Sequence, residues 1–394
     1  MSHLCTHDLC NGCWACANIC PMKCIRMEKD AEGFFRPIVD ESQCVKCGRC
    51  NDICPVLHLP ALQKEEPKCY AAMNRSEAQR ANASSGGVFI LLARWVIDRG
   101  GVVFGAAFDA DFSVSHQSAE TLEEAKAFCG SKYLQSRIGN VYQQAKRYLK
   151  ENRWVLFTGT PCQILGLRAF LGEDSPRLLT MDIVCHGVPS PDVWQRYISF
   201  RACMDNQGKP PQRICFRSKT SGWSKYSVVF QYDNSDYRVP YACDPFMRGF
   251  LHNLYLRPSC HQCIAKGINR AADFTLADFW GIQNCLPHMD DDRGTSLVLI
   301  HSEKGHTIWS EIENQIVSEA IEPEKALIYN SSATESSAVH PNRSRFFNSY
   351  QKNANFPKLI QKLVPDEKKP SIIRRVLSKI KRTLLSGIDG LYRS

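Results

Sequence analysis

The sequence predicts a small α+β domain at the N-terminus, followed by a larger α/β domain with a mixed or parallel sheet. Two observations lead to this fold class. Two cysteine runs of identical spacing lie near the N-terminus, and from residue 68 onward strand-like apolar runs alternate with helical ones. Such alternation is typical of a sheet whose strands are joined by helical crossovers.

The composition indicates a globular protein with metal sites. The chain has 394 residues, of which 44% are hydrophobic and 20 are cysteines. No signal-peptide pattern opens the sequence, and no apolar run reaches the ~20 residues of a membrane-spanning helix. We therefore expect a cytoplasmic protein, in which clustered cysteines indicate metal binding rather than disulfides.

The charge is unevenly distributed. The formal net charge is +9, and from Lys358 onward ten Lys and Arg residues stand against three Asp and Glu, so the rest of the chain is nearly neutral. The sequence shows no basic groove with interleaved aromatic residues. We expect no nucleic-acid partner.

The two cysteine runs, each spaced C-x2-C-x2-C-x3-C and closed by a proline, carry the strongest signal. This is the pattern of bacterial ferredoxins with two [4Fe–4S] clusters, in which the fourth cysteine of each run reaches the other cluster. Residues 1–62 are therefore predicted to form a 2[4Fe–4S] ferredoxin-type domain. The predicted ligands are Cys10, Cys13, Cys16 and Cys54 for the first cluster, and Cys44, Cys47, Cys50 and Cys20 for the second.

Zinc is the alternative for these cysteines. Structural zinc usually uses two separated C-x2-C pairs, which two identical four-cysteine runs do not resemble. Cys5 and Cys24 lie outside the pattern and are predicted not to be ligands. Two clusters make an electron relay, but the pattern identifies neither donor nor acceptor.

A small-residue loop opens the first long helix of the larger domain. Strands are expected near Lys68–Met73 and Val102–Phe108, with a helix over Val88–Asp98 between them. Ser84-Ser85-Gly86-Gly87 precedes that helix. Free backbone N–H groups at such a loop suit a phosphate, although the same loop can simply permit a tight turn.

Two cysteines are expected at neighbouring strand ends. Strands near Trp154–Thr158 and Leu178–Val184, joined by a helix over Gln163–Leu171, place Cys162 and Cys185 at the carboxyl edge of the sheet. Ligands of open α/β sheets gather at that edge.

A later C-x2-C pair, Cys260 and Cys263, adds two more thiols. The four together suffice for a third [4Fe–4S] cluster. Ordinary buried cysteines are the alternative, and zinc is a further one.

Three further features are candidates for a ring site or for proton transfer. The segment 277–281 (ADFWG) follows a strand-like run and can border a flat ring or form a core corner. The segment 216–219 (FRSK) with Trp223 puts positive charge beside an aromatic, or is a solvated loop. His186 is a candidate proton donor, against the alternative of a merely hydrogen-bonded histidine.

Seven segments appear in a fixed order after the ferredoxin-type pattern. They are SSGG (84–87), SKYLQS (131–136), FTGTPCQ (157–163), CHGVPSP (185–191), FRSK with GW (216–223), RPSCHQC (257–263) and ADFWG (277–281). To about residue 300 the chain resembles the coenzyme F420 hydrogenase/dehydrogenase beta-subunit family. The resemblance implies an oxidoreductase that binds FAD and iron–sulfur clusters and passes electrons between a flavin, a carrier and a substrate.

The resemblance also implies particular residues. The family's extra cluster falls on the four cysteines Cys162, Cys185, Cys260 and Cys263. Lys132 is implied to face the flavin or its phosphates and is, with His186, a candidate catalytic residue. The implied flavin contacts are Ser84, Ser85, Gly86, Gly87, Lys132, Tyr133, Gln135 and Ser136. The carrier is of the coenzyme F420, ferredoxin or NAD(P)H type, and the sequence does not name the substrate.

The domain prediction follows from these segments. Residues 68–150 and 151–340 are predicted to be the two parts of the flavin-binding domain, and 341–394 a basic amphipathic tail. From Ser371 to Tyr392 apolar residues recur at helical spacing among basic ones. We expect this helix to contact an anionic membrane surface, at the inner face of the membrane, or a partner; a solvated helix is the alternative.

Three functions compete. The first is a flavin-dependent and cluster-dependent oxidoreductase that exchanges electrons with a redox partner protein or a small carrier. The second is a non-catalytic relay subunit of a larger redox complex, and the third an interaction protein with structural clusters. The SSGG loop and the extra cysteines favour the enzyme, because a bare relay needs neither.

Overall fold

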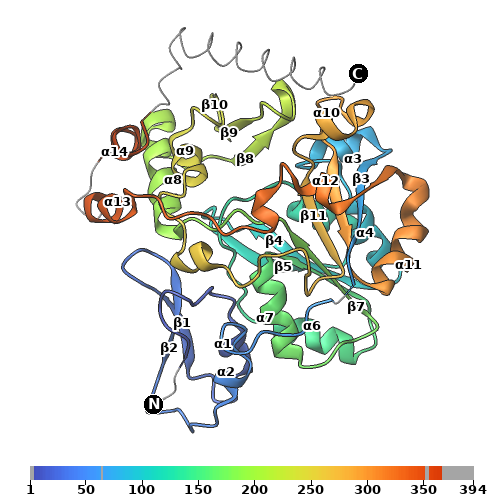
Figure 1. Cartoon of the computed structure of the whole chain (residues 1–394). Coiled ribbons are helices and arrows are strands. Elements are labelled where there is room, and N and C mark those ends of the chain that lie inside the picture. The colour runs from blue at the N-terminus through green and yellow to red at the C-terminus, as the bar shows by residue number, and fades with distance from the viewer. Residues whose placement is uncertain (1–3, 64, 351–354, 366–394) are drawn as a thin grey trace, which may run out of the picture.

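The computed structural model describes residues 4–63, 65–350 and 355–365 (Figure 1). Its N-terminal part is a small α+β domain built on an antiparallel hairpin. Asp30 closes the hairpin turn, because its Oδ1 accepts the backbone N–H groups of Glu32 and Phe34. The elements are α1 (Ala15–Ile19), β1 (Ile25–Lys29), β2 (Phe35–Val39) and α2 (Arg49–Asp52).

An eight-stranded mixed sheet forms the centre of the larger domain. Its strand order is β13-β3-β12-β11-β7-β6-β4-β5, and the pairs β4–β6, β6–β7 and β7–β11 are parallel. The predicted fold class is thereby confirmed, with the sheet mixed. The strands are β3 (Lys68–Asn74), β4 (Val102–Phe108), β5 (Val114–Ala119), β6 (Val155–Gly159), β7 (Leu178–Ile183), β11 (Phe274–Asp278), β12 (Ser296–Ile300) and β13 (Ile316–Ile321).

Helices cover both faces of this sheet (Figure 1). One face packs against α4 and α11, and the other against α6 and α7, through two separate apolar clusters. Trp14 and Ile19 of the N-terminal domain join the second cluster, so this domain docks on the α6–α7 side. The helices here are α3 (Glu77–Asn82), α4 (Phe89–Ile97), α5 (Leu122–Ala125), α6 (Val141–Lys150), α7 (Pro161–Leu171), α10 (Ile282–Cys285), α11 (Glu303–Ile312) and α12 (Pro323–Leu327).

The start of α7 is fixed by its own sequence. Thr160 is the N-cap, Pro161 occupies the first helical position, and Gln163 completes a capping box with Thr160. Each of these satisfies or removes a backbone donor that a helix start leaves unpaired. Cys162 therefore lies in the first turn of α7, directly after the carboxyl end of β6.

A second lobe, around one aromatic-rich core, lies beside the sheet. Trp194, Tyr197, Phe230 and Phe246 pack in this core, and Trp194 is almost fully buried. The lobe comprises α8 (Pro191–Asn206), the antiparallel strands β8 (Arg213–Ser218), β9 (Ser227–Gln231) and β10 (Asp236–Pro240), and the helices α9 (Pro245–Leu251), α13 (Arg343–Tyr350) and α14 (Phe356–Leu363).

The first part of the predicted tail belongs to this lobe. Phe346 and Phe347 of α13, and Leu359 and Ile360 of α14, are buried in its core. The amphipathic helix expected from Ser371 to Tyr392 lies outside the described residues. The domain boundaries remain a prediction, and the sheet takes strands from both segments 68–150 and 151–340.

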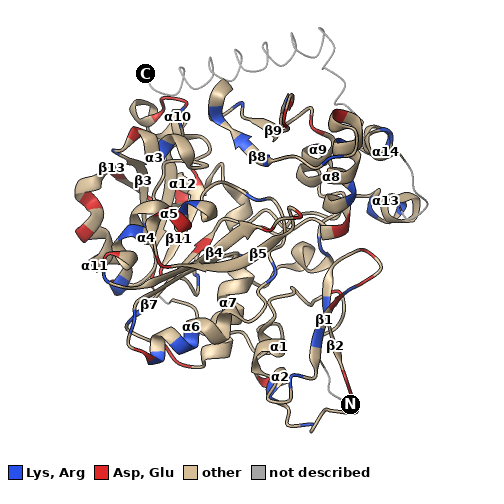
Figure 2. Cartoon of the chain, turned by 180° about the vertical axis from the view of Figure 1, so that it is seen from behind, with Lys and Arg blue, Asp and Glu red and all other residues tan. Residues whose placement is uncertain are grey.

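The charged residues in view are of mixed sign. Basic and acidic residues are interspersed over the elements shown in Figure 2. Among the described residues, no helix is both long enough and apolar enough to cross a membrane.

We expect Gly166→Ala to destabilise the protein, although alanine is the better helix former by about 1 kcal/mol. A Cβ at this position of α7 would lie 2.9 Å from Cys13 Cβ and 3.0 Å from the Tyr142 hydroxyl. Relieving such crowding costs about 1–3 kcal/mol. Thermal unfolding of the anaerobically purified protein measures this, and a melting temperature raised by the alanine would contradict the close docking of the N-terminal domain on α7.

Candidate functional site

The eight ferredoxin-type cysteines line two cavities. Cys10, Cys13, Cys16 and Cys54 line one, which we call the first thiol cavity. Cys20, Cys44, Cys47 and Cys50 line the other, the second thiol cavity. The chain thus crosses over between the two cavities, because the fourth cysteine of each run lies with the first three of the other run.

Each of these cavities also borders a fifth cysteine. Cys5 lines the first thiol cavity. Cys24 lines the second, with its Sγ 3.4 Å from the Sγ of Cys20. Both were predicted not to be ligands, and they are placed as neighbours of the predicted ligands.

A third thiol cavity lies at the carboxyl edge of the sheet. Cys162 and Cys185 follow β6 and β7, and they line it together with Cys260 and Cys263. Burial first, and then the neighbouring cysteines, raise the pKa values of Cys162 and Cys185 to about 12. Half-buried thiols such as Cys162 and Cys185 that resist ionisation suit a group that brings positive metal charge, since coordination to a metal deprotonates a thiol.

Cations surround this cavity. Lys266 Nζ donates to the backbone oxygen of Cys185 at 2.6 Å. Arg257 and Arg270, both almost fully buried, also line it. His186 lines it too and packs edge-on against Phe250, and burial lowers the pKa of its imidazole. Buried positive charge of this kind suits an anionic cluster.

A large cleft opens at the same edge of the sheet. Its volume is about 1220 Å³, and it runs from α3 past the end of β4 to β8. Drug-sized and cofactor-sized ligands occupy pockets of ~300–1,000 Å³. Of the described residues that line it, eight are Lys or Arg and two are Asp or Glu. The cleft therefore suits a large anionic ligand.

The predicted flavin residues divide into two groups. Ser84 and Lys132 line the cleft, and Ser84 Oγ lies 2.8 Å from Ser131 Oγ. Lys132 Nζ donates to the backbone oxygen of Cys129, and burial lowers its pKa to about 8.

The remaining predicted residues pack behind the cleft. A Cβ on Gly86 would lie 2.2 Å from the Ala72 backbone oxygen, so this glycine permits close packing of the SSGG loop on β3. Ser85 Oγ donates to Thr295 O, and Gly87 has a φ of 82°. Ser136 Oγ lies 2.8 Å from His116 Nδ1.

Two motifs meet at the wall of the cleft. Arg217 of the FRSK segment forms an ion pair with Asp278 of ADFWG at 2.5 Å, and Trp223 Nε1 donates to the same carboxylate at 3.0 Å. The rings of Trp223 and Trp280 stack at 4.9 Å. Within the described part of the chain, Nε and Nη2 of Arg217 are buried without a hydrogen-bond partner. The sequence suggested positive charge beside an aromatic. In the structure this charge, Arg217, is buried and held by the ion pair with Asp278, in a group of residues that we call the Arg217 corner.

Aromatic contacts lead from this corner to the third thiol cavity. The Tyr133 hydroxyl accepts from Arg217 Nη1 at 3.2 Å. The ring of Tyr133 packs on Phe250 at 5.2 Å, and Phe250 on His186 at 5.1 Å. Among the predicted residues, Tyr133 therefore lies between the cleft and the four cysteines.

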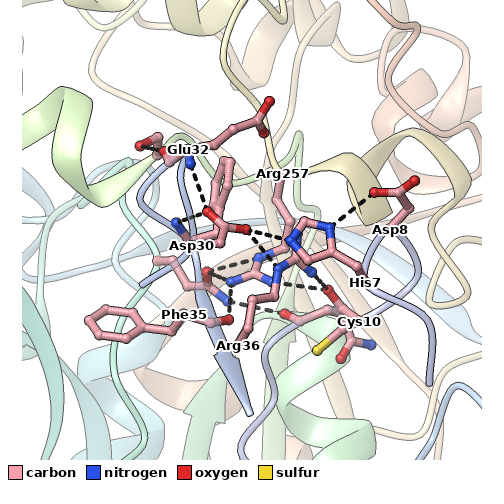
Figure 3. Close-up of polar contacts among 12 residues, drawn as sticks. His7, Asp8, Cys10, Asp30, Glu32, Phe35, Arg36 and Arg257 are labelled. Carbon is pink, nitrogen blue, oxygen red and sulfur yellow. Dashed lines mark hydrogen bonds and ion pairs between the residues drawn. The ribbon is translucent and has the colours of Figure 1, made fainter. Parts of the chain in front are cut away.

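Gln135 lies at the docked N-terminal domain. Its Nε2 donates to Asn11 O at 3.1 Å, and its Oε1 accepts from the buried Arg257. Arg257 also reaches Cys10 and Phe35, as Figure 3 shows. The sequence did not single out Arg257, because its partners come from three separate segments.

Within the described residues, no group of three or more His, Cys, Asp or Glu side chains is arranged to hold a single metal ion.

Comparison with known proteins defines the class of the chain. Residues 9–57 match the 4Fe-4S dicluster domain. Residues 152–326 match the C terminus of the coenzyme F420 hydrogenase/dehydrogenase beta subunit. The chain therefore carries an iron–sulfur dicluster domain and the C-terminal domain of an oxidoreductase-type family, that of the coenzyme F420 hydrogenase/dehydrogenase beta subunit. The resemblance inferred from the sequence is confirmed by these two domains.

Individual relatives are distant or short. An uncharacterized protein of Methanocaldococcus jannaschii is 26% identical over 203 residues, which cover 43% of this chain and 54% of the relative. An uncharacterized ferredoxin of the same organism is 39% identical over 51 residues, which cover 12% of this chain and 76% of the ferredoxin. This chain thus spans about half the length of the first relative.

One solved structure matches over most of the chain. A chain of the F420-reducing [NiFe] hydrogenase complex of Methanosarcina barkeri is 17% identical, with a TM-score of 0.45. The match covers 75% of this chain and 90% of that one.

We expect Arg217→Met to destabilise the protein by about 3–5 kcal/mol, because it leaves the half-buried Asp278 carboxylate without its cation. Arg217→Met combined with Asp278→Asn should cost less than the sum of the single changes, since the amide that replaces the carboxylate carries no unpaired charge. Urea unfolding of the three variants measures the difference. Strictly additive losses would contradict the coupling of these two residues.

Proposed function

We propose that the chain is an iron–sulfur flavoprotein oxidoreductase. It would transfer electrons between a reduced carrier, of the coenzyme F420, ferredoxin or NAD(P)H type, and a substrate or partner. The observation that carries the proposal is the spatial arrangement of four cavities. A cation-lined cleft is followed by a four-cysteine cavity, and this by the two ferredoxin-type cavities.

The cleft is the proposed FAD site. Its excess of Lys and Arg suits the phosphates of the cofactor, and Arg217 offers two buried nitrogens, Nε and Nη2, without a hydrogen-bond partner among the described residues. Lys132 and Ser84 would contact the same ligand. When bound, FAD supplies the exchange between two-electron chemistry and the one-electron chemistry of the clusters.

The three thiol cavities are the proposed sites of three [4Fe–4S] clusters. The first two take the cysteine sets named above, and the third takes Cys162, Cys185, Cys260 and Cys263. The chain's own contribution is to shield most of these thiols from solvent and to place cations beside the third cavity. Burial, charge and hydrogen bonding are the means by which a protein sets cluster potentials.

The second thiol cavity supports a role in relay as well. Cys47 is exposed, and so are Met22 and Val45 beside it. This opening favours electron exchange with a partner protein. A non-catalytic relay subunit is therefore the second candidate function.

Acid-released flavin per chain, measured after anaerobic purification, separates the two candidates. About one flavin per chain supports the enzyme and justifies assays with reduced F420, NADH and reduced ferredoxin as donors. Protein that holds its clusters but no flavin contradicts the proposed FAD site and favours the relay.

We expect Cys162→Ala to remove about four irons per chain, from ~12 to ~8, because the third cluster loses a ligand. Cys203→Ala, at an exposed cysteine of α8 outside all three cavities, is the matched control and should keep the full iron content. Iron and sulfide analysis with EPR of the reduced protein gives the readout. An unchanged iron content in Cys162→Ala would refute the third cluster.

Binding of FAD to the flavin-depleted protein should weaken as the pH rises through about 8, the pKa of Lys132. Below that pH the ammonium is charged and attracts the cofactor's phosphates, and above it the charge is lost. Lys132→Met should bind more weakly below pH 8 and lose the part of the pH dependence that Lys132 supplies. Fluorescence titration from pH 6.5 to 9 tests this, and identical profiles for both proteins would remove Lys132 from the binding site.

A further inference from the structure

Arg257 lies where the first and third thiol cavities meet. The residue is fully buried, lines the third cavity and precedes Cys260 by three positions. Its Nη1 donates to the backbone oxygen of the first-cavity residue Cys10 at 3.0 Å, and its Nη2 to that of Phe35 at 2.9 Å. One side chain, which lines the third cavity, thus contacts the ligand loop of the first; Figure 3 shows its contacts with Cys10 and Phe35.

Gln135 orients this guanidinium. Its Oε1 accepts from Nε and Nη2 of Arg257 at 3.0 and 2.7 Å, while its Nε2 donates to Asn11 O. Asn11 lines both the first and the third cavity. The two cavities therefore share a wall, and the wall is tied to the larger domain through Gln135.

The backbone beside Arg257 leaves no room for a side chain. Gly12 has a φ of 64°, and a Cβ on it would lie 2.7 Å from Arg257 Nη2 and 2.9 Å from Gln135 Nε2. The loop between Cys10 and Cys13 thus packs directly on the guanidinium, at a distance that a larger residue would not permit.

The charges around Arg257 favour an anion on each side. A second buried guanidinium, Arg36, also donates to Cys10 O, at 2.7 Å, and it forms an ion pair with Asp30 at 2.9 Å. Burial and the charge of Arg36 lower the pKa of Arg257. Two buried guanidinium groups, of which only Arg36 pairs with a carboxylate, form a region that anionic clusters in the two cavities would neutralise.

We propose that Arg257 is a positioning residue that fixes the separation of the first and third clusters and stabilises an electron on either one by the same positive charge. This inference rests on the proposed function. In the step concerned, one electron leaves one cluster and enters the other, which is reduced as the first is oxidised. No proton moves and no bond breaks. A positive charge near both clusters raises both reduction potentials together and leaves the difference between them unchanged.

Redox titration of the full-length holoprotein, followed by EPR, tests the proposal. In Arg257→Met the ratio of reduced to oxidised cluster at a fixed potential should fall about tenfold for both clusters, equivalent to ~59 mV for one electron. Arg36→Met is the matched control: it removes a buried arginine bonded to the same Cys10 oxygen, but Arg36 does not line the third cavity. It should shift the first cluster alone. Cys162→Ala identifies the signals of the third.

The iron content and the reduction potentials together separate failure of the proposed function from failure of this inference. Wild-type protein with ~8 irons per chain lacks the third cluster, which overturns the proposed function and this inference together. With ~12 irons, unchanged potentials in Arg257→Met overturn this inference alone.

If the methionine variant fails to hold its clusters, Arg257→Lys is measured instead. Lysine keeps the charge but cannot reach Cys10, Phe35 and Gln135 at once. We expect potentials close to wild type and a weaker magnetic interaction between the first and third clusters. A large shift in potential would overturn the role of the charge, and an unchanged interaction the role in positioning.

Discussion

The burial of one guanidinium ties the N-terminal domain to the rest of the molecule. Taking a charge out of water costs several kcal/mol, and it is tolerated only where hydrogen bonds replace the lost water. Arg257 finds those bonds at Cys10, Phe35 and Gln135, of which the first two belong to the N-terminal domain. Undocking that domain would leave the buried charge without these acceptors, so docking and the integrity of the third thiol cavity are linked.

Glycine positions complete this constraint. Gly12 lets the first cysteine loop approach Arg257, and Gly166 lets helix α7 approach Cys13. Both contacts bring the first cysteine loop of the N-terminal domain against a segment that carries a cysteine of the third thiol cavity. The absence of a side chain at these two positions therefore sets how closely the first and third thiol cavities approach each other.

The predictable parts of the structure are those encoded by local spacing. The cysteine runs identified two four-thiol sets because ligand spacing at a cubane site is a local property. The second lobe was not anticipated, since its core joins α8 and β8–β10 with α13 and α14 from the far end of the described chain. Within the site, Ser84 and Lys132 were expected to contact a ligand, and both line the cleft. Gly86 and Gln135 were expected there as well, but Gly86 packs on β3 and Gln135 contacts the N-terminal domain. A motif fixes residue types along the chain, but the direction of each side chain depends on what the fold places opposite it.

The order of burial defines a path for the proposed relay. Cys10 and Cys13 are buried between the N-terminal domain and α7, whereas Cys47 of the second cavity is exposed. The third cavity is connected to the cleft through Tyr133, Phe250 and His186. Under the proposed function, electrons that enter at the cleft meet solvent, and so a partner protein, at the second cluster. The buried cations near the first and third cavities would then stabilise the electron midway along this path.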